Sequence, residues 1–224
     1  MGHFQMPVLA QVVKPDYFSM LVWPGGGYIG LLLWALSVVT LAIIIQYFIT
    51  IRRGTLMPDL VRQNIQTLFE NKQYREAIEI TATEPSLLSY VVHAALTEAA
   101  HGYGAMERAM EEAAEEKTTN VLRKIEWLNL IGNVSPMLGL LGTVWGMINA
   151  FMEIVAAKGI PPADKLAYSI GIALVTTLLG LSIAIPSLAV FAIMRNRIDA
   201  SSTEAVMASE ELIAPFRPGT KSGE

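Results

Sequence analysis

Three long stretches without a charged residue limit what this chain can fold into. They run from Tyr17 to Ile51, from Trp127 to Met152 and from Leu166 to Met194. A helix needs about 20 mostly apolar residues to cross the hydrocarbon core of a bilayer, and each stretch is long enough. We therefore expect an all-α membrane protein with three transmembrane helices.

The first stretch is longer than one crossing needs. Pro24 and the glycines at 25–27 interrupt it, and such residues cluster where helices begin or end, so we expect the first transmembrane helix at 27–50. The preceding residues mix apolar and polar side chains and are expected to lie along the membrane surface. A cleaved signal peptide is the alternative, but the chain starts without a positive region and its apolar run comes late.

Lysine and arginine near the ends of the spans predict the orientation, because these residues are enriched in cytoplasmic loops. Arg52 and Arg53 follow the first span, Arg123 and Lys124 precede the second, and Arg195 follows the third. All three spans agree on a periplasmic N-terminus and a cytoplasmic C-terminus. The expected parts are a periplasmic or interfacial segment at 1–26, transmembrane helices at 27–50, 127–156 and 165–194, a cytoplasmic helical domain at 51–126, a periplasmic loop at 157–164 and a cytoplasmic tail at 195–224.

The cytoplasmic domain is predicted to be helical. Its last helix, from Ala105 to Leu128, is amphipathic, and no proline or glycine separates it from the second span. Together they predict one helix of about 50 residues, or about 75 Å, that extends from the membrane into the cytoplasm. The apolar face of its cytoplasmic part consists of Met106, Met110, Ala114, Val121, Ile125 and Leu128. Its acidic face is interpreted as solvated, with a docking surface for a partner as the alternative. The tail after Ser201 is polar and is expected to end in disorder.

Shorter helices are expected before the amphipathic helix that begins at Ala105. Pro58 and Asp59 open one helix, residues 71–73 interrupt it, and Tyr74–Thr83 form the next. A further helix is expected from Pro85 to about Ala100, ended by the glycines at 102 and 104.

Small and hydroxyl residues recur at helical spacing in the second and third spans, whereas the first span is bulky and aliphatic. The two sets are Gly139, Thr143, Gly146 and Ala150, and Ser169, Ala173, Thr177, Gly180 and Ala184. Steps of three and four place each set on one face of its helix. These faces allow two interpretations: close packing between helices, or the lining of a narrow, partly polar passage.

The transmembrane stretches contain no aspartate, glutamate, histidine, lysine or arginine. A proton relay normally needs a titratable group in the membrane, so a proton that crosses here needs a group from another polypeptide. The chain also lacks cysteine and any phosphate-binding glycine-rich motif, its net charge is −4, and its three histidines are far apart in sequence. We expect no cofactor, no metal site, no nucleic-acid partner and no enzymatic activity.

Two segments resemble a known family. Residues 135–147, SPMLGLLGTVWGM, and residues 173–186, ALVTTLLGLSIAIP, resemble the second-span and third-span signatures of the MotA/TolQ/ExbB proton channel family. Three spans with a periplasmic N-terminus resemble its ExbB/TolQ-like branch. The resemblance implies a pentamer in the bacterial inner membrane, and a pore that holds the single transmembrane helices of an ExbD- or TolR-like partner, whose aspartate takes up the proton. The pair would energise a TonB- or TolA-like envelope protein.

The resemblance also implies roles for single residues. Thr143 and Thr177 match hydroxyls that face the pore near the partner's aspartate, while Thr176, about 100° away around the helix, is expected at a subunit contact. Pro136 and Pro186 match prolines expected to kink the helices. The full predicted pore lining and proton pathway is Thr143, Thr177, Thr176, Gly139, Gly146, Ala173 and Ser169.

The chain departs from the family pattern where some ExbB members carry a glutamate or a Tyr-Asn pair. Ile172 and Phe191-Ala192 occupy those positions, which reduces the polar lining. A membrane scaffold that anchors partner proteins and conducts nothing is the alternative function.

Overall fold

The computed structural model describes residues 27–52, 56–157 and 162–218. Over these ranges the regular structure is helical, without strands, which confirms the predicted all-α class. The interfacial segment expected at 1–26, half of the loop expected at 157–164 and the last six residues of the tail lie outside the described residues. The long helices are α2 (Gly27–Thr50), α7 (Tyr103–Ala156) and α8 (Ala163–Ile213); the short ones are α4 (Asp59–Glu70), α5 (Tyr74–Thr83), α6 (Leu87–Thr97), η1 (Ala99–His101) and η2 (Ala214–Phe216).

Three helices in the described part are long and apolar enough to cross a membrane, namely α2, α7 and the helix that begins at Ala163. The helix α7 has 54 residues and is continuous from the predicted amphipathic segment through the second apolar stretch. The predicted extension of the second span as a long helix is therefore confirmed.

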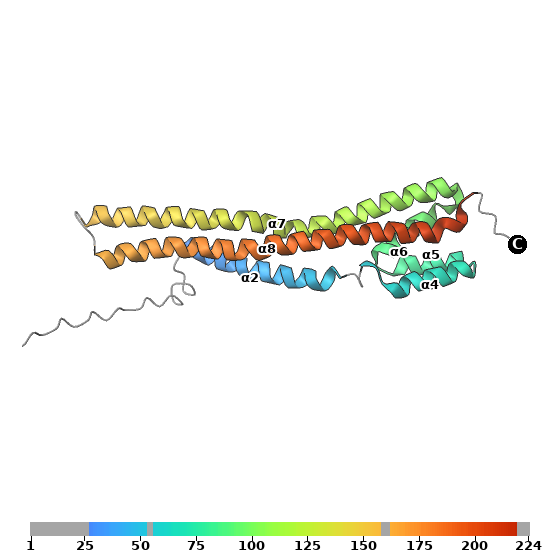
Figure 1. The fold of residues 1–224 in the computed structure, drawn as a ribbon, viewed down its shortest axis with the longest axis horizontal. Helices are drawn as coiled ribbons and strands as arrows, with labels where there is room; N and C mark the ends of the chain where they lie inside the picture. The colour runs from blue at the N-terminus through green and yellow to red at the C-terminus, as the bar shows by residue number, and fades with distance from the viewer. Residues whose placement is uncertain (1–26, 53–55, 158–161, 219–224) are drawn as a thin grey trace, which may run out of the picture. The chain divides into compact units, whose positions relative to one another are not determined.

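The chain divides into two compact units. The first contains the start of α2 and residues 137–181, and the second contains residues 35–136 and 182–224. Within each unit α7 and α8 lie side by side and run in opposite directions (Figure 1). Contacts in the first unit follow this antiparallel register, because Gly146 meets Ala173 whereas the earlier Gly139 meets the later Gly180.

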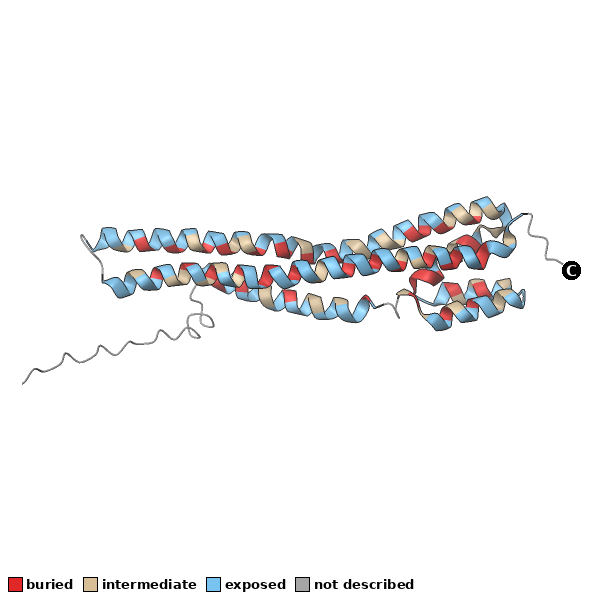
Figure 2. Cartoon of the chain, viewed as in Figure 1, coloured by how far each residue is buried: buried red, intermediate tan, exposed pale blue. Residues whose placement is uncertain are grey.

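The second unit is built around an apolar core that the short helices share with α7 and α8. The predicted apolar face of α7 is buried there at Met106, Met110 and Ala114. Buried residues of the short helices pack against it: Val61, Ile65, Ala77, Leu87, Leu88, Val91, Val92, Ala95 and Leu96. Burying each valine, leucine or isoleucine side chain among them contributes about 1.5–3 kcal/mol. Figure 2 shows buried residues along α7, α8 and the short helices, between exposed ones.

Exposed polar contacts also join the helices of this unit. The Tyr90 hydroxyl donates a hydrogen bond to Glu116, which raises the pKa of the Tyr90 phenol, and the Lys117 ammonium lies 4.8 Å from the centre of the Tyr90 ring. Arg62 of α4 forms a 2.7 Å ion pair with Glu211 of α8. An exposed pair of this kind contributes at most about 1 kcal/mol, so the apolar core is what holds the unit together.

The helix α8 continues well beyond the transmembrane helix predicted at 165–194, as far as Ile213. Its last turns are part of the core rather than a free polar tail. Ala205, Ala208, Leu212 and Ile213 are buried against the short helices, and the Phe216 ring packs edge-on against two aromatic rings of α4 and α5. A regular spacing of small and apolar residues after Ile198 supplies this buried face.

The turns between the short helices follow local backbone preferences. Lys72 has φ +59°, a left-handed conformation that ends α4 before α5 begins. Ser86 caps α6 by accepting a hydrogen bond from the backbone nitrogen of Ser89, so α6 begins at Leu87 and not at Pro85. The helix then ends at Thr97, earlier than expected, and Gly102 with φ +90° separates η1 from α7.

Candidate functional site

Small residues bring α7 and α8 into close contact in the first unit. A Cβ atom added to Gly146 would lie 2.7 Å from the Ala173 Cβ and 3.1 Å from the Ser169 carbonyl oxygen. One added to Gly142 would overlap the Thr176 side chain, and one added to Gly139 would lie 3.0 Å from the Thr176 carbonyl oxygen. The backbones approach this closely only because these positions have no side chain. We call this contact the hairpin seam: Gly139, Gly142, Gly146 and Ala150 of α7 with Ser169, Ala173, Thr176 and Gly180 of α8.

The seam encloses most of the residues predicted to line a pore. Gly139, Gly146, Ser169, Ala173 and Thr176 are all buried within the single chain, with Thr176 only 1% exposed. Thr176 therefore contacts α7 of its own chain, at Gly142, and the subunit contact expected for it stays a prediction. Of the seven predicted residues, Thr143 and Thr177 alone remain partly exposed.

The hydroxyls of the two half-exposed threonines already donate hydrogen bonds to the backbone. Thr143 Oγ1 donates to the Leu140 carbonyl at 2.6 Å, and Thr177 Oγ1 donates across the seam to the Gly139 carbonyl at 3.1 Å. A hydroxyl has one proton and two lone pairs, so each oxygen can still accept a hydrogen bond from a second group. A protonated carboxylic acid or a water molecule is a suitable donor.

The two predicted kink prolines lie inside helices. Pro136 lies within α7 and Pro186 within α8, and each lacks the backbone donor of an ordinary residue. A neighbouring serine, Ser135 or Ser187, donates its hydroxyl to the carbonyl four residues earlier, each at 2.6 Å. Such bonds are typical of bent helices. That the prolines bend the helices stays a prediction.

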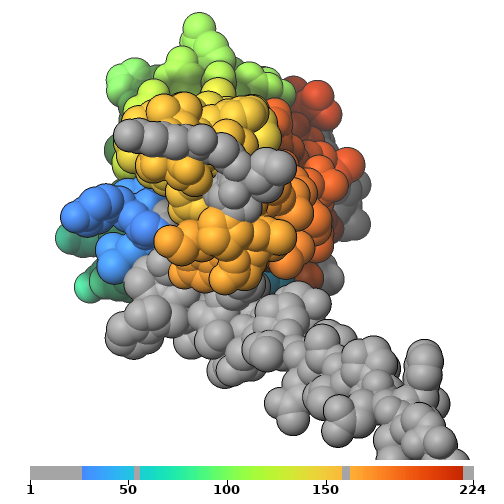
Figure 3. All heavy atoms as spheres, turned by 90° about the vertical axis from the view of Figure 1, so that its left-hand side faces the viewer, coloured from blue at the N-terminus to red at the C-terminus, as the bar shows by residue number. Residues whose placement is uncertain are grey.

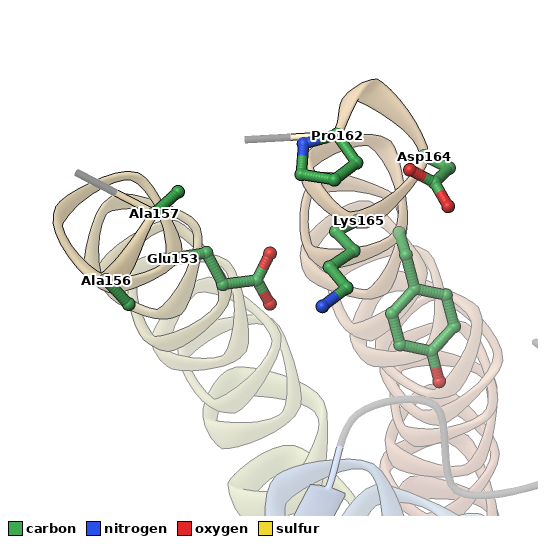
Figure 4. A pocket seen from close by; sticks show the side chains of 7 residues that line it. Glu153, Ala156, Ala157, Pro162, Asp164 and Lys165 are labelled. Atoms are coloured by element: carbon green, nitrogen blue, oxygen red, sulfur yellow. The ribbon is translucent and has the colours of Figure 1, made fainter. Parts of the chain in front are cut away.

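An acidic side chain near the end of the helix predicted at 127–156 lies next to the hairpin seam. Glu153 closes the second charge-free stretch, three residues before α7 ends, and its carboxylate points toward α8 (Figure 4). Ser169 Oγ donates to Glu153 Oε1 at 3.2 Å, while Oε2 is buried without a hydrogen-bond partner in the described part of the chain. The sequence spacing could have indicated this position, because Glu153 lies seven residues after Gly146 and therefore on the same face of the helix.

A cavity of about 670 Å³ opens beside this carboxylate. Its lining is Glu153, Ala156 and Ala157 of α7 with Pro162, Asp164, Lys165 and Tyr168 at the start of α8. Figure 3 looks onto the end of the first unit where α7 ends and α8 begins. The Lys165 side chain extends toward the glutamate, whereas the Asp164 carboxylate points away from it (Figure 4).

Large apolar side chains cover the outer faces of the three long helices and are exposed in the single chain. Leu31, Leu41, Met137, Leu140 and Phe151 each expose more than half of their surface. Exposed apolar area on this scale marks contact with lipid or with other protein chains. The long apolar helices, their bare outer faces and the tight seam together define a multi-pass α-helical membrane protein.

The chain belongs to the MotA/TolQ/ExbB proton channel family, whose model matches residues 62–207. This confirms the resemblance found in the two span signatures. The match includes the whole of α7, the described part of the first unit from residue 137 onward, and α8 up to Met207.

Relatives in the ExbB and TolQ branch match over shorter segments. The biopolymer transport protein ExbB of Xanthomonas campestris is 36% identical over 86 residues, which are 38% of this chain and 34% of the relative. The biopolymer transport protein exbB1 of Vibrio cholerae is 48% identical over 62 residues, 28% of this chain and 27% of the relative. The Tol-Pal system protein TolQ of Haemophilus influenzae is 34% identical over 93 residues, 42% of this chain and 40% of the relative. The matched segments thus span well under half the length of each of these relatives.

Proposed function

We propose that the chain is the pore-forming stator subunit of a bacterial inner-membrane motor driven by the proton-motive force. In this proposal a pentamer encloses the single transmembrane helices of an ExbD- or TolR-like partner, and the pair energises a TonB- or TolA-like envelope protein. The observation that carries it is the position of Thr143 and Thr177. They stay partly exposed beside the seam, in spans that hold no acid of their own between Trp127 and Met152 or between Leu166 and Met194.

The two threonines suit contact with a partner's carboxyl group. Each hydroxyl is oriented by a bond to a backbone carbonyl, Leu140 for Thr143 and Gly139 for Thr177, and each keeps lone pairs that accept from a protonated acid. Hydrogen bonding to the neutral form of an acid favours that form. The remaining residues predicted to line the pore, Gly139, Gly146, Ser169, Ala173 and Thr176, take a supporting role, because they hold the two helices at the separation that presents the hydroxyls.

The proposed orientation places the N-terminus and the loop between α7 and α8 in the periplasm, and the short helices and C-terminus in the cytoplasm. Lysines and arginines beside the spans support it. One proton that moves inward across this membrane releases about 2.3 kcal/mol per 100 mV, so a few protons supply enough energy to move a folded partner domain.

Proton flux tests the proposal in vesicles that contain this chain and its single-span partner. Thr143→Val and Thr177→Val keep the shape of the side chain and remove the hydroxyl, and we expect each to abolish the flux. Thr40→Val is the matched control, because Thr40 lies in α2 and, among the described residues, bonds only to its own helix, at the Leu36 carbonyl. Full proton flux in both Thr143→Val and Thr177→Val would show that the two threonines are not part of the proton path.

A non-conducting scaffold that anchors partner proteins is the second candidate. The burial of five predicted pore residues within one chain favours it, because close packing alone explains their small size. The scaffold predicts that the wild-type chain and its partner give no proton flux under an applied potential or a pH gradient, whereas the motor predicts flux.

A further inference from the structure

The helix α7 carries a polar groove where its apolar stretch begins. Its volume is about 450 Å³, and we call it the amide groove, lined by Arg123, Glu126, Trp127, Asn129, Leu130 and Asn133. The Asn133 amide donates to the side-chain oxygen of Asn129 at 2.9 Å, and the Asn129 amide donates to Glu126 at 2.6 Å. Asn133 is exposed about 9 Å inside the charge-free stretch that starts at Trp127. Lipid tails offer an amide no hydrogen bond, so lipid is an unsuitable occupant of this groove.

The amide groove includes the side of α7 that faces away from α8. A Cβ atom added to Gly132 would overlap the Leu188 side chain of α8, so Gly132 faces α8. Leu130 stands two positions earlier, which is about 200° around the helix, and it is 50% exposed. Ala189 of α8 likewise stands two positions after Ser187, which is 0% exposed, and is itself exposed. Leu130 and Ala189 therefore lie on opposite flanks of the hairpin.

A second copy of this chain supplies a surface that fits the groove. In the proposed function α7 and α8 both face one passage, so the helices of successive copies alternate around it and α7 of one copy meets α8 of the next. The outward face of α8 carries Ser182, Ala189 and Asn196 in steps of seven, all exposed. Small residues allow a neighbouring helix to approach closely. Pro186 has no N–H for the Ser182 carbonyl, which therefore remains an acceptor for an amide such as that of Asn133.

The two flanks also match in depth. Rotation about an axis normal to the membrane leaves depth unchanged, so groups at one depth in the chain meet at that depth between copies of a ring. Gly132 contacts Leu188, and α7 and α8 are antiparallel. Two residues back along α7 and one residue on along α8 lead in the same direction, so Leu130 and Ala189 lie at nearly the same depth.

Opposite charges meet at the next level. Ile125 of α7 packs in one buried cluster with Ile198 of α8. Just beyond this cluster, on the side away from the apolar stretch, α7 carries Arg123 and α8 carries Asp199. Both are exposed, and neither belongs to an ion pair in the described part of the chain. Each is thus available to the other across a contact between copies.

We propose that the amide groove is the seat of α8 from a second copy of this chain. Leu130 packs against Ala189 of the second copy, Arg123 lies opposite its Asp199, and the Asn133 amide bonds to its backbone. The proposal rests on the proposed function for the ring arrangement. It adds the residues that join one copy to the next, on the flanks of the hairpin rather than in the hairpin seam.

Disulfide formation between copies tests this contact in membranes that contain the full chain. The chain has no cysteine, so Leu130→Cys and Ala189→Cys in one chain introduce its only two thiols. A disulfide needs Cα atoms within about 7 Å, so mild oxidation should join copies into a series of covalent multimers. Leu130→Cys with Leu41→Cys is the matched control. Leu41 is 60% exposed, and its depth is similar because Tyr47 of the same helix bonds to the Lys124 carbonyl. The control should give no such series; an equal series there, or none with Ala189→Cys, would overturn the proposal.

Charge reversal in the variant with cysteines at 130 and 189 tests the polar part of the contact. Arg123→Glu should slow multimer formation about tenfold, because it places two acidic side chains opposite each other. Asp199→Arg in the same chain should restore the rate. Arg108→Glu should leave the rate unchanged, because Arg108 is exposed on α7 outside the groove. A rate that Asp199→Arg does not restore would refute the pairing of Arg123 with Asp199.

Proton flux separates this contact from the motor. Covalent multimers from a chain and partner that give no flux would refute the motor and leave the contact between copies standing. Wild-type flux from a chain whose cysteines at 130 and 189 form no multimers would overturn the contact and leave the motor standing.

Discussion

Moving one methyl group across the hairpin seam gives a sharp test of the packing between α7 and α8. Gly146→Ala adds a methyl group 2.7 Å from the Ala173 Cβ and 3.1 Å from a backbone oxygen of Ser169. Carbon atoms in contact prefer separations of about 3.5–4.0 Å, so the two helices must move apart. Ala173→Gly removes the methyl group in the way, and the double variant therefore keeps the total side-chain volume of the seam.

The expected magnitudes follow from two opposing effects. Overpacking a close contact destabilises by about 1–3 kcal/mol, and the better helix propensity of alanine over glycine offsets about 1 kcal/mol of it. Gly146→Ala alone should thus lower the free energy of unfolding by about 0–2 kcal/mol, and Ala173→Gly alone by about 1 kcal/mol. The double variant should be more stable than the sum of the two changes predicts, by about 1–2 kcal/mol.

Reversible unfolding in mixed detergent micelles measures the free energy of unfolding for the four proteins of this cycle. Gly30→Ala serves as a control, because a Cβ at this helical glycine of α2 would have no neighbour within 4 Å. It should not destabilise the chain. Strict additivity of Gly146→Ala and Ala173→Gly would refute the reasoning, since residues that face a pore rather than each other do not couple.

Two further predictions concern the second unit. Ala205→Leu should destabilise the unit by about 1–3 kcal/mol, because Ala205 is 0% exposed in the core between α8 and the short helices. Met207→Leu, at a residue that is 65% exposed, should be nearly neutral. Thermal unfolding compares the two variants, and equal melting temperatures would contradict the packing of the α8 end. Arg62→Met should change the free energy of unfolding by less than about 1 kcal/mol, because the side chains of the ion pair are exposed, 42% for Arg62 and 68% for Glu211. A much larger loss of stability in a denaturant titration would contradict this weak contribution.

The sequence predicted the helices with the strongest periodic or compositional signal. The helix expected at 27–50 is α2, residues Tyr74–Thr83 are α5, and the apolar face around Met106 and Met110 is buried as expected. Charge-free length and amphipathic spacing are local properties of the chain, so they can be recognised without the tertiary structure.

The end of α8 and the direction of the small-residue faces were harder to predict. Most residues after Ser201 are polar or small, and only their packing against α4–α6 shows that Ala205 and Ala208 belong to a core. A face of small residues can meet a helix of the same chain or a pore, and composition does not separate the two. The structure separates them by enclosing Ala173 and Gly146 and leaving Thr143 and Thr177 partly exposed.

Glu153 illustrates the same limit for a single side chain. The sequence places it at the edge of the second charge-free stretch, where a glutamate usually reaches water. Its direction depends on the hydrogen bond from Ser169 of the other helix, 16 residues later. Only the antiparallel register of α7 and α8 brings the two groups together.

Thiol accessibility tests the central claim most directly, that Thr143 and Thr177 face a water-filled passage. The chain contains no cysteine, so single substitutions Thr143→Cys and Thr177→Cys can be probed in membranes that contain the assembled chain. The thiolate is the reactive form and needs water, so both should react with a small water-soluble thiol reagent. Leu41→Cys on the bare outer face of α2 should not react. If both threonine positions are as unreactive as position 41, the two hydroxyls do not face water and the claim of a passage is contradicted.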